Sequence, residues 1–407
     1  MNFIDGGVTA AKGFKAASVA AGIKYKDRDD MALVASDVDA VVAGAFTTNL
    51  VKASPVMWDI DIVKNEETAR AIVLNSGIAN ACTGKEGDEA NLAMAKSIAD
   101  GLGINEREVL TASTGVIGMP MPIDRVKEGA KLLVTKLDDT LKAGEDAARA
   151  IMTTDTIKKE CAVTFKIDGK DVTLGGMTKG SGMIHPNMAT MLCVITTDVA
   201  ISKNLLQEAM SDIVKDSFNM ISVDRDTSTN DTYVAFANGM AGNEKITEKD
   251  DNYKAFYEAL KAVSIKLAKI MASDGEGATK LIEAKIINAN TKENAKILAK
   301  SIITSNLVKT MIYGCDSNCG RVICAMGYSG AKFDPNNMDL YIESSAGKLL
   351  LFKEGKFTEY SEDKATEILS QDAVTTIADL HNGECEATAW GCDLTYDYVK
   401  INADYRS

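Results

Sequence analysis

Histidine is scarce in this chain, which has only two among its 407 residues, His185 and His381. Neither stands in a recognisable triad pattern. The sequence therefore does not favour an enzyme that activates a serine or a cysteine through a histidine base. The composition favours a catalyst that needs no histidine.

Positive charge is also in deficit. The 45 Lys and Arg residues face 58 Asp and Glu residues, which leaves a formal net charge of −13. The sequence contains no dense run of Lys or Arg. Because nucleic acid binding needs a basic surface to neutralise phosphates, we expect no nucleic acid partner and favour a small-molecule one.

Long apolar runs are missing as well. No segment approaches the roughly 20 apolar residues of a membrane-spanning helix. Residues 1–25 contain no continuous apolar core of the kind that a signal peptide requires. We therefore expect a cytoplasmic protein without a membrane partner.

Paired cysteines of the metal-binding kind are absent too. The eight cysteines stand singly, and the spacing of Cys315, Cys319 and Cys324 matches no common zinc pattern. Reduced, mostly buried thiols are the expected state. We expect neither a metal nor another cofactor.

What the chain does have is apolar content, 46% of 407 residues, enough to fill the cores of two or three domains. Strand-like and helix-like segments alternate through much of the chain, and a β-rich pattern begins at Met338. Asp168-Gly169 predicts a hairpin between strands at 161–167 and 172–174. We also predict helices over 87–102, 138–152 and 251–271, strands over 109–113 and 191–197, and a strand-like segment over 394–399.

The stretch 179–198, KGSGMIHPNMATMLCVITTD, joins a glycine-rich loop to the core strand through Ala189-Thr190. Glycines allow backbone conformations that other residues avoid, so this approach to Thr190 can be strained. We hypothesise that the chain cuts itself before Thr190. The freed α-amino group, with a pKa of about 7.7 to 8.0, would then serve as the base for the Thr190 hydroxyl. By residue type alone, the ordinary alternative is a β-forming threonine at the start of a strand.

Several further blocks of sequence accompany this stretch in a fixed order. They are TTNLVKASPV at 47–56, NSGIANACTG at 75–84, STGVIG at 113–118, DRDTSTND at 224–231, GEGATK at 275–280 and the C-terminal ATAWGCDLTYDYVKINADYRS. Together with KGSGMIHPNMATML they closely resemble the ornithine acetyltransferase family of arginine biosynthesis, also called glutamate N-acetyltransferase.

The resemblance implies an α+β or α/β fold, a layered αββα-type sandwich shared with self-processing aminopeptidases, with a smaller β-rich C-terminal subdomain. It implies an α fragment, 1–189, that forms the first part of the catalytic domain. The β fragment would complete that domain with 190–280 and add a C-terminal subdomain, 281–407. The two fragments are expected to assemble as α2β2.

The resemblance also implies the chemistry. Thr190 would carry an acetyl group from N2-acetyl-L-ornithine to L-glutamate in a ping-pong reaction, with Thr114 and Gly115 as the oxyanion hole. Substrate contacts are implied at Thr153, Lys179, Thr190, Glu276, Asn402 and Ser407. The residues themselves fit these roles, since Lys179 lies on the glycine-rich loop and Glu276 stands between two glycines. On residue type alone, the ordinary alternative is that Lys179 is a surface lysine and Glu276 an acidic residue in a loop.

The sequence does not decide whether acetyl-CoA is a substrate or what the loop at 316–321 does. Some family members also accept acetyl-CoA, and no motif in this sequence separates them from the others. The family's Asp-Pro-Asn-Trp-Gly-Arg is replaced here by residues Asp316 to Arg321, DSNCGR, so we assign no role to that loop.

Two rival functions remain. A hydrolase of the same fold, such as an aminopeptidase or amidase, would let water resolve the acyl-enzyme and would not depend on glutamate. A noncatalytic amino-acid-binding protein would show neither self-cleavage nor an acyl-enzyme.

Overall fold

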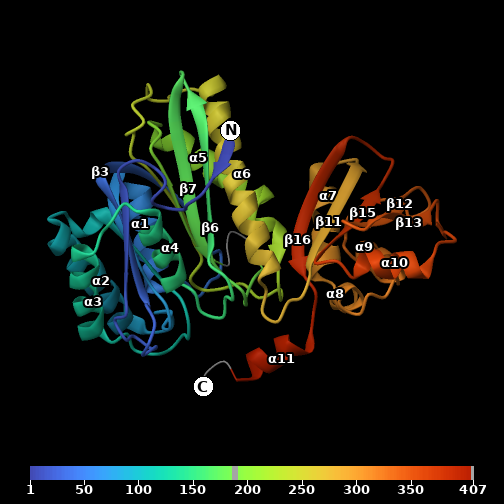
Figure 1. Ribbon diagram of the computed structural model, residues 1–407, viewed down its shortest axis with the longest axis horizontal. Coiled ribbons are helices and arrows are strands. Elements are labelled where there is room, and N and C mark those ends of the chain that lie inside the picture. The colour runs from blue at the N-terminus through green and yellow to red at the C-terminus, as the bar shows by residue number, and fades with distance from the viewer. Residues whose placement is uncertain (186–190, 405–407) are drawn as a thin grey trace. The chain divides into compact units, whose positions relative to one another are not determined.

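The computed structural model describes residues 1–185 and 191–404, which fold into two compact units (Figure 1). The first unit comprises residues 1–180, 191–218 and 227–267. The second comprises residues 181–185, 219–226 and 268–404. The division expected at 189/190 and 280/281 follows fragments rather than these units, and it stays a prediction.

A nine-stranded mixed sheet forms the centre of the first unit, in the order β1-β6-β7-β8-β10-β3-β4-β5, with β2 paired to β3. Two of its pairs, β8 with β10 and β4 with β5, are parallel. Its strands are β1 (Asn2–Ile4), β2 (Phe14–Val19), β3 (Met31–Phe46), β4 (Thr68–Asn75), β5 (Val109–Ser113), β6 (Lys159–Ile167), β7 (Lys170–Lys179), β8 (Leu192–Thr197) and β10 (Thr232–Ala237).

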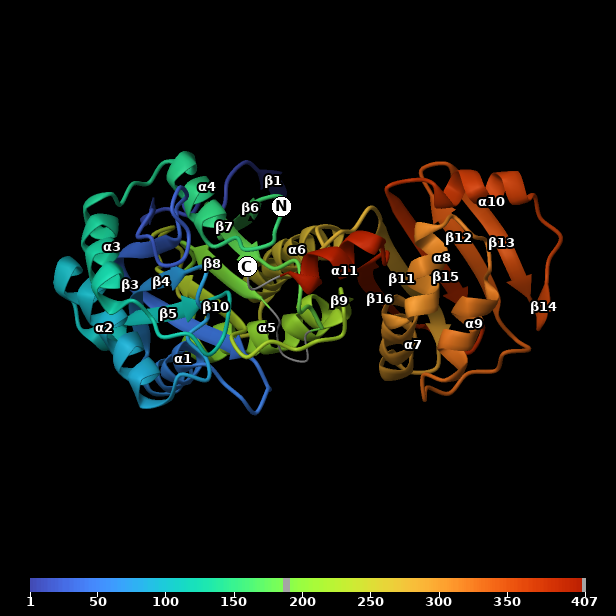
Figure 2. The ribbon, with the colours of Figure 1, turned by 90° about the horizontal axis from the view of Figure 1, so that it is seen from below.

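The strands β3, β4 and β5 bury both of their faces. Successive side chains of a strand point to opposite faces, so Ile72 and Leu74 enter one apolar core while Ala71 and Val73 enter another. Helices α2 and α3, which lie side by side in Figure 2, fill the second core, and α1 and α4 contribute to the first. The helices of this part are α1 (Ser54–Asn65), α2 (Gly84–Leu102), α3 (Ile123–Thr135), α4 (Leu141–Ala150), α5 (Lys203–Ile213) and α6 (Asp251–Ser273).

The predicted hairpin is present between β6 and β7. Asp168 (φ +51°) and Gly169 (φ +77°) both adopt the left-handed conformation that a tight two-residue turn requires. The strand β7 runs on to Lys179, where Lys179 pairs with Leu192 of β8. The expectation that Lys179 lies on a glycine-rich loop is therefore wrong, because sheet pairing extends five residues beyond the predicted end of the strand.

The other strongly patterned segments are where the sequence predicts them. The strand β5 has the predicted bounds, α2 and α4 overlap the predicted helices, and α6 covers 251–273. Every residue of β8 is buried, as expected of a core strand. Both units combine helices with a mixed sheet, which confirms the α+β class.

A seven-stranded mixed sheet organises the second unit, in the order β14-β13-β12-β15-β11-β16-β9. Its strands are β9 (Ile221–Ser222), β11 (Leu281–Ala289), β12 (Asp339–Ser344), β13 (Gly347–Lys353), β14 (Lys356–Phe357), β15 (Ala373–Asp379) and β16 (Cys385–Cys392). Its helices are α7 (Lys292–Thr304), α8 (Asn306–Tyr313), α9 (Gly320–Gly327), α10 (Glu362–Leu369) and α11 (Tyr396–Ala403). The β-rich pattern after Met338 thus corresponds to β12–β16, with α10 between β14 and β15.

The strand expected over 394–399 is wrong, since residues from Tyr396 onward form the helix α11. Tyrosine and valine favour strands only where a neighbouring strand offers pairing and packing. Here the chain leaves the sheet after Cys392, and Asp393 turns away to accept the N–H groups of Thr279 and Lys280.

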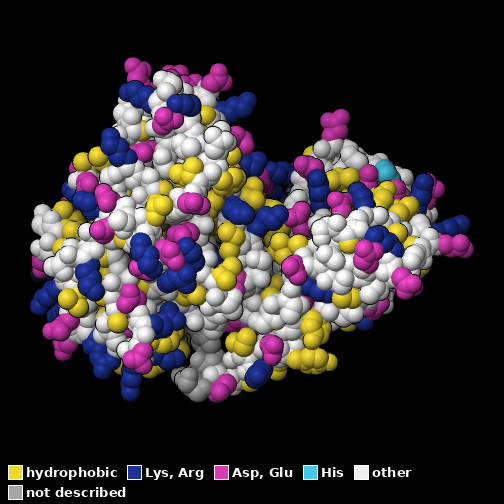
Figure 3. Space-filling view, in the orientation of Figure 1, with side chains coloured by type: hydrophobic (Ala, Val, Ile, Leu, Met, Phe, Trp, Pro, Cys, Tyr) yellow, Lys and Arg dark blue, Asp and Glu magenta, His cyan; other side chains and the backbone are white. Residues whose placement is uncertain are grey.

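Across residues 1–185 and 191–404, no helix has the length and apolarity to cross a membrane. The same residues contain no group of three or more His, Cys, Asp or Glu side chains arranged to hold a metal ion. On the face drawn in Figure 3, acidic and basic side chains are interspersed.

A buried acid in α1 makes the stability of the first unit depend on pH. Asp59 is fully buried and accepts the Thr111 N–H at 2.8 Å. Burial raises the pKa of the Asp59 carboxyl well above its ordinary value, although hydrogen bonds from Thr111 oppose the shift. Because the folded-state pKa exceeds the unfolded one, the stability linked to this site is complete below about pH 4 and is lost as the pH rises toward the folded value.

We therefore predict that Asp59→Asn raises the free energy of unfolding at pH 7 and changes it little at pH 4. Thermal unfolding at the two pH values measures the effect. Asp61→Asn, which removes an exposed partner of Arg107, is the matched control and should cost no more than about 1 kcal/mol at pH 7. Equal pH dependence of the wild-type protein and Asp59→Asn would contradict the assignment.

Candidate active site

The turn after β5 presents two hydrogen-bond donors at the edge of the first sheet. Thr114 donates its N–H to the Asn75 carbonyl at 3.0 Å, which continues the pairing of β4 with β5. Gly115 has φ +129°, and a Cβ at this position would lie 2.3 Å from the Gly77 carbonyl, so only glycine fits. Among the described residues, no acceptor is bonded to the Gly115 N–H. This turn can therefore offer a hydroxyl and a backbone N–H to an oxyanion.

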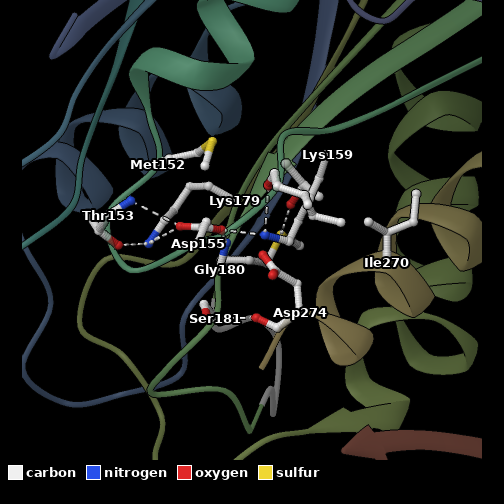
Figure 4. A network of polar contacts seen from close by, with 12 residues as sticks. Met152, Thr153, Asp155, Lys159, Lys179, Gly180, Ser181, Ile270 and Asp274 are labelled. Carbon is white, nitrogen blue, oxygen red and sulfur yellow. Dashed lines mark hydrogen bonds and ion pairs between the residues drawn. The ribbon is translucent and has the colours of Figure 1, made fainter. Parts of the chain in front are cut away.

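Lys179 brings this turn together with a second loop. Its side chain is buried, and its Nζ donates to the Thr153 Oγ1 at 2.8 Å and to the Thr114 Oγ1 at 3.2 Å. Thr153 follows α4, so two separate segments, at Thr114 and Thr153, meet at the ammonium of a residue on β7. Figure 4 shows Lys179 pointing toward Thr153 and Asp155. Lys179 is thus a buried, fixed cation rather than a surface lysine.

Asp155 holds this cation in place, although no pattern in the sequence predicts a role for it. Its carboxylate lies 2.6 Å from Lys159 Nζ and 3.8 Å from Lys179 Nζ, and it accepts the N–H groups of Thr153 at 3.0 Å and Gly180 at 2.7 Å (Figure 4). Burial by itself would raise the pKa of the Asp155 carboxyl, but the two lysines and these hydrogen bonds hold it well below its ordinary value. Asp155 is therefore a permanent anion. Its sequence context, TTDTIKKE, carries no periodic signal that marks it.

The segment 227–231 links the Thr114 turn to β8. Asn230 donates to the Ser113 carbonyl at 2.9 Å and to the Ser113 Oγ at 3.1 Å, immediately before Thr114. Asp231 is buried and accepts the N–H of Met191, and burial raises the pKa of its carboxyl well above the ordinary value. The composition of DRDTSTND, residues 224–231, is typical of a polar turn and does not reveal these contacts, because turn residues and buried anchoring residues share the same composition.

Glu276 and Asn402 form a second group, within the second unit. Glu276 is buried rather than exposed on a loop, and Asn402 Nδ2 donates to its Oε2 at 2.7 Å. The same Nδ2 donates to the Tyr398 carbonyl at 3.0 Å. A Cβ at Gly182 would come within 2.3 Å of the Glu276 carboxyl group, so the backbone of the glycine-rich segment packs directly against this acid.

A possible serine–histidine pair in the second unit does not suit base catalysis. His185 Nδ1 lies 3.0 Å from the Ser222 Oγ, and Ser222 is buried. Burial, together with Lys300 and Arg225, lowers the pKa of His185 to about 4. A group with that pKa is a poor general base near neutral pH.

The structure thus brings Thr114 and Thr153 onto Lys179, with Gly115 beside Thr114, and it pairs Glu276 with Asn402. Ala189, Thr190 and Ser407 lie outside the described residues. The roles of all these residues stay predictions.

Comparison with known proteins gives a family match, two relatives that align over the full length, and a solved structure that aligns with about half of the chain. The sequence model of the ArgJ family matches residues 15–407. The arginine biosynthesis bifunctional protein ArgJ of Caldanaerobacter subterraneus subsp. tengcongensis is 49% identical over 407 residues, and that of Symbiobacterium thermophilum is 50% identical over 409 residues, with 100% of both chains covered in each case. A crystal structure of arginine biosynthesis bifunctional protein argJ from Bacillus halodurans is similar with 46% identity and a TM-score of 0.50, over 99% of that chain and 53% of this one.

The buried charges around Asp155 provide a test of the site's architecture. Asp155→Ala leaves the Lys159 ammonium, whose side chain has no exposed surface, without this carboxylate, so we predict a loss of about 3 to 5 kcal/mol in the free energy of unfolding. Because the pKa of Asp155 is lowered on folding, its contribution is present above the unfolded pKa of about 3.9 and is lost as the pH falls below it.

Denaturant unfolding at pH 7 and pH 3 measures both effects. The control, Asp171→Ala, breaks the exposed pair of Lys166 with Asp171 and should cost about 1 kcal/mol or less. Equal losses for the two variants at pH 7 would show that the Asp155 network does not stabilise the first unit.

Proposed function

The chain belongs to the ArgJ family, and we propose on that basis that it is a glutamate N-acetyltransferase of arginine biosynthesis, which transfers acetyl from N2-acetyl-L-ornithine to L-glutamate. The structural observation that supports this activity is that the Thr114 and Thr153 hydroxyls both contact the ammonium of the buried Lys179.

Oxyanion stabilisation is the part of the reaction for which the contacts are most specific. Lys179 donates to the Thr114 Oγ1, so this oxygen's own proton is left to donate elsewhere and is polarised by the cation. The Gly115 N–H supplies a second donor. Together they would hold the oxyanion that forms when the Thr190 hydroxyl attacks the acetyl carbonyl.

The remaining steps, proton transfer and acyl transfer, take place at Thr190. The α-amino group of Thr190 takes the proton of its own hydroxyl and passes it to the departing ornithine amine, which leaves acetyl-Thr190. The amine of glutamate then attacks this ester and regenerates the enzyme. The chain itself supplies the nucleophile, the base and the oxyanion donors, so the route needs neither a metal nor a cofactor.

Self-cleavage between Ala189 and Thr190 would create that α-amino group. The Thr190 hydroxyl attacks the Ala189 carbonyl, the peptide becomes an ester, and water hydrolyses it. The Bacillus halodurans chain supports this step, because 99% of it aligns with only 53% of this chain, a share that a fragment from Thr190 to Ser407 would match.

We assign each polar group, within its own unit, to one charged group of acetylornithine. Lys179, with Thr153 and Ser407, would meet the α-carboxylate. Asn402 directs its Nδ2 to two carbonyl-type acceptors, Glu276 and the Tyr398 carbonyl, so its Oδ1 is what it can offer to a substrate. Glu276 and Asn402 then present only acceptors, which suits the side-chain ammonium of acetylornithine.

We extend the proposal in three respects. The relatives are named bifunctional, which supports acetyl-CoA as a second donor for the same acetyl-Thr190. The cleaved fragments would assemble as α2β2. The enzyme would act in the cytoplasm.

Thr190→Ala tests cleavage and catalysis together. We predict one chain of full length in the intact mass spectrum and no acetyl transfer, whereas the wild-type protein gives fragments 1–189 and 190–407. Thr190→Ser, which keeps a hydroxyl, is the matched control and should still be cut. Splitting of Thr190→Ala at 189/190 would refute the mechanism. Release of acetate by the wild-type enzyme at the same rate without glutamate would favour the hydrolase of the same fold.

Glu276→Gln tests the assignment of the ammonium end. A hydrogen bond to a charged group contributes about 1.5 to 3 kcal/mol, so we predict a loss of about 10- to 100-fold in kcat/KM for acetylornithine. N-acetylnorvaline, which lacks the ammonium, should be used equally well by the variant and the wild-type enzyme. An equal loss for both donors would show that Glu276 does not contact the ammonium.

A further inference from the structure

A lysine and a cysteine meet in the second unit. Lys280 precedes β11 and Cys315 follows α8, and the Lys280 Nζ lies 2.9 Å from the Cys315 Sγ. Both residues are partly exposed. A small solvent-borne reagent can therefore reach a contact between an amine and a thiol.

The contacts of the Lys280 ammonium distinguish the Cys315 sulfur from the other atoms near it. In the described part of the chain, the Lys280 ammonium contacts the Ile312 carbonyl at 3.0 Å and the Cys315 Sγ, and it forms no ion pair with a carboxylate. Among the described residues, the Cys315 sulfur is therefore the acidic side-chain atom in contact with this ammonium. The thiolate is the form of cysteine that attacks peroxides.

Among the described residues, none of the other seven cysteines has a hydrogen bond to a lysine, and burial raises the pKa of the Cys193 thiol well above its ordinary value. Burial raises the pKa of the Cys161, Cys319 and Cys392 thiols to about 11, which disfavours their thiolates. Cys82 and Cys324 are exposed, and neither has a hydrogen bond to a lysine among the described residues.

We propose that Lys280 and Cys315 form a peroxide-sensitive modification site, in which hydrogen peroxide joins the two side chains through a sulfenamide bond. The Cys315 thiolate attacks one peroxide oxygen, the O–O bond breaks, and the sulfur becomes a sulfenic acid. The hydroxide that leaves takes a proton from the Lys280 ammonium and becomes water. The neutral amine attacks the sulfur, the S–N bond forms, the S–O bond breaks, and the second hydroxide leaves with a proton of the nitrogen as water.

The bridge would join the start of β11 to the end of α8, 35 positions apart in the sequence. Lys280 also donates its backbone N–H to Asp393 at 3.0 Å, next to Thr279, so the bridge would fix the end of the segment 275–280. A thiol reductant reverses a sulfenamide, which makes the modification a reversible one.

Mass spectrometry of the wild-type protein tests the proposal without any assay of acetyl transfer. After treatment with equimolar hydrogen peroxide, alkylation and digestion, we expect a peptide pair linked through Lys280 and Cys315, lighter by two hydrogen atoms than the two free peptides together. Dithiothreitol should release the pair. Lys280→Arg and Cys315→Ser should lose it, and Cys324→Ser, which removes an exposed thiol of α9, should keep it.

Two results would overturn the proposal. One is oxidation of Cys315 to sulfinic or sulfonic acid with no linked peptide at any ratio of peroxide to protein. The other is oxidation of Cys82 or Cys324 while Cys315 stays reduced. Both can be read from the wild-type protein, so the folding of a variant does not decide the outcome.

Discussion

The buried carboxylate of Asp155 is the constraint on which the polar centre of the first unit depends. It pairs with two lysines that have almost no exposed surface, and it accepts the backbone N–H groups of Thr153 and Gly180. Two charged side chains in an apolar interior are tolerated only when they are paired and fully hydrogen-bonded. Because Asp155 meets that condition, Lys179 can stand at the end of β7 as a fixed cation, with its ammonium on the hydroxyls of Thr114 and Thr153.

This arrangement explains how acetyl transfer proceeds with so little histidine. A histidine enzyme separates the base from the nucleophile and needs a third group to orient the base. Here the proposed base and nucleophile belong to Thr190 itself, so the fold has to supply only oxyanion donors and substrate contacts. The proposed oxyanion donors come from the end of β5, where the Gly77 backbone leaves no room for a side chain at Gly115. The segment 227–231 anchors that end through Asn230 and the start of β8 through Asp231.

The sequence predicts those parts of the fold whose apolar residues recur with a helix or strand period, and the hairpin whose turn residues allow one tight turn. The strand at 109–113, the helix at 251–273 and the Asp168-Gly169 hairpin are of this kind. It missed what depends on contacts distant in sequence. Asp155 lies in an irregular segment, β7 continues to Lys179 because β8 pairs with it, and α11 is helical because no strand lies beside it. For the candidate site, residue types and the family resemblance predicted Lys179, Thr114, Thr153, Glu276 and Asn402. They did not predict the buried acids Asp155 and Asp231, which hold the site residues of the first unit in place.

The most direct measurement of the proposed chemistry is the location of the acetyl group in the absence of an acceptor. The purified enzyme is incubated with acetylornithine alone, quenched in acid and digested, and the peptide that begins at residue 190 is examined by mass spectrometry. We expect one acetyl group on Thr190, formed with release of ornithine and lost on addition of glutamate as N-acetylglutamate appears. An unmodified peptide, with acetyl transfer only when both substrates are present together, would contradict an acetyl-threonine intermediate.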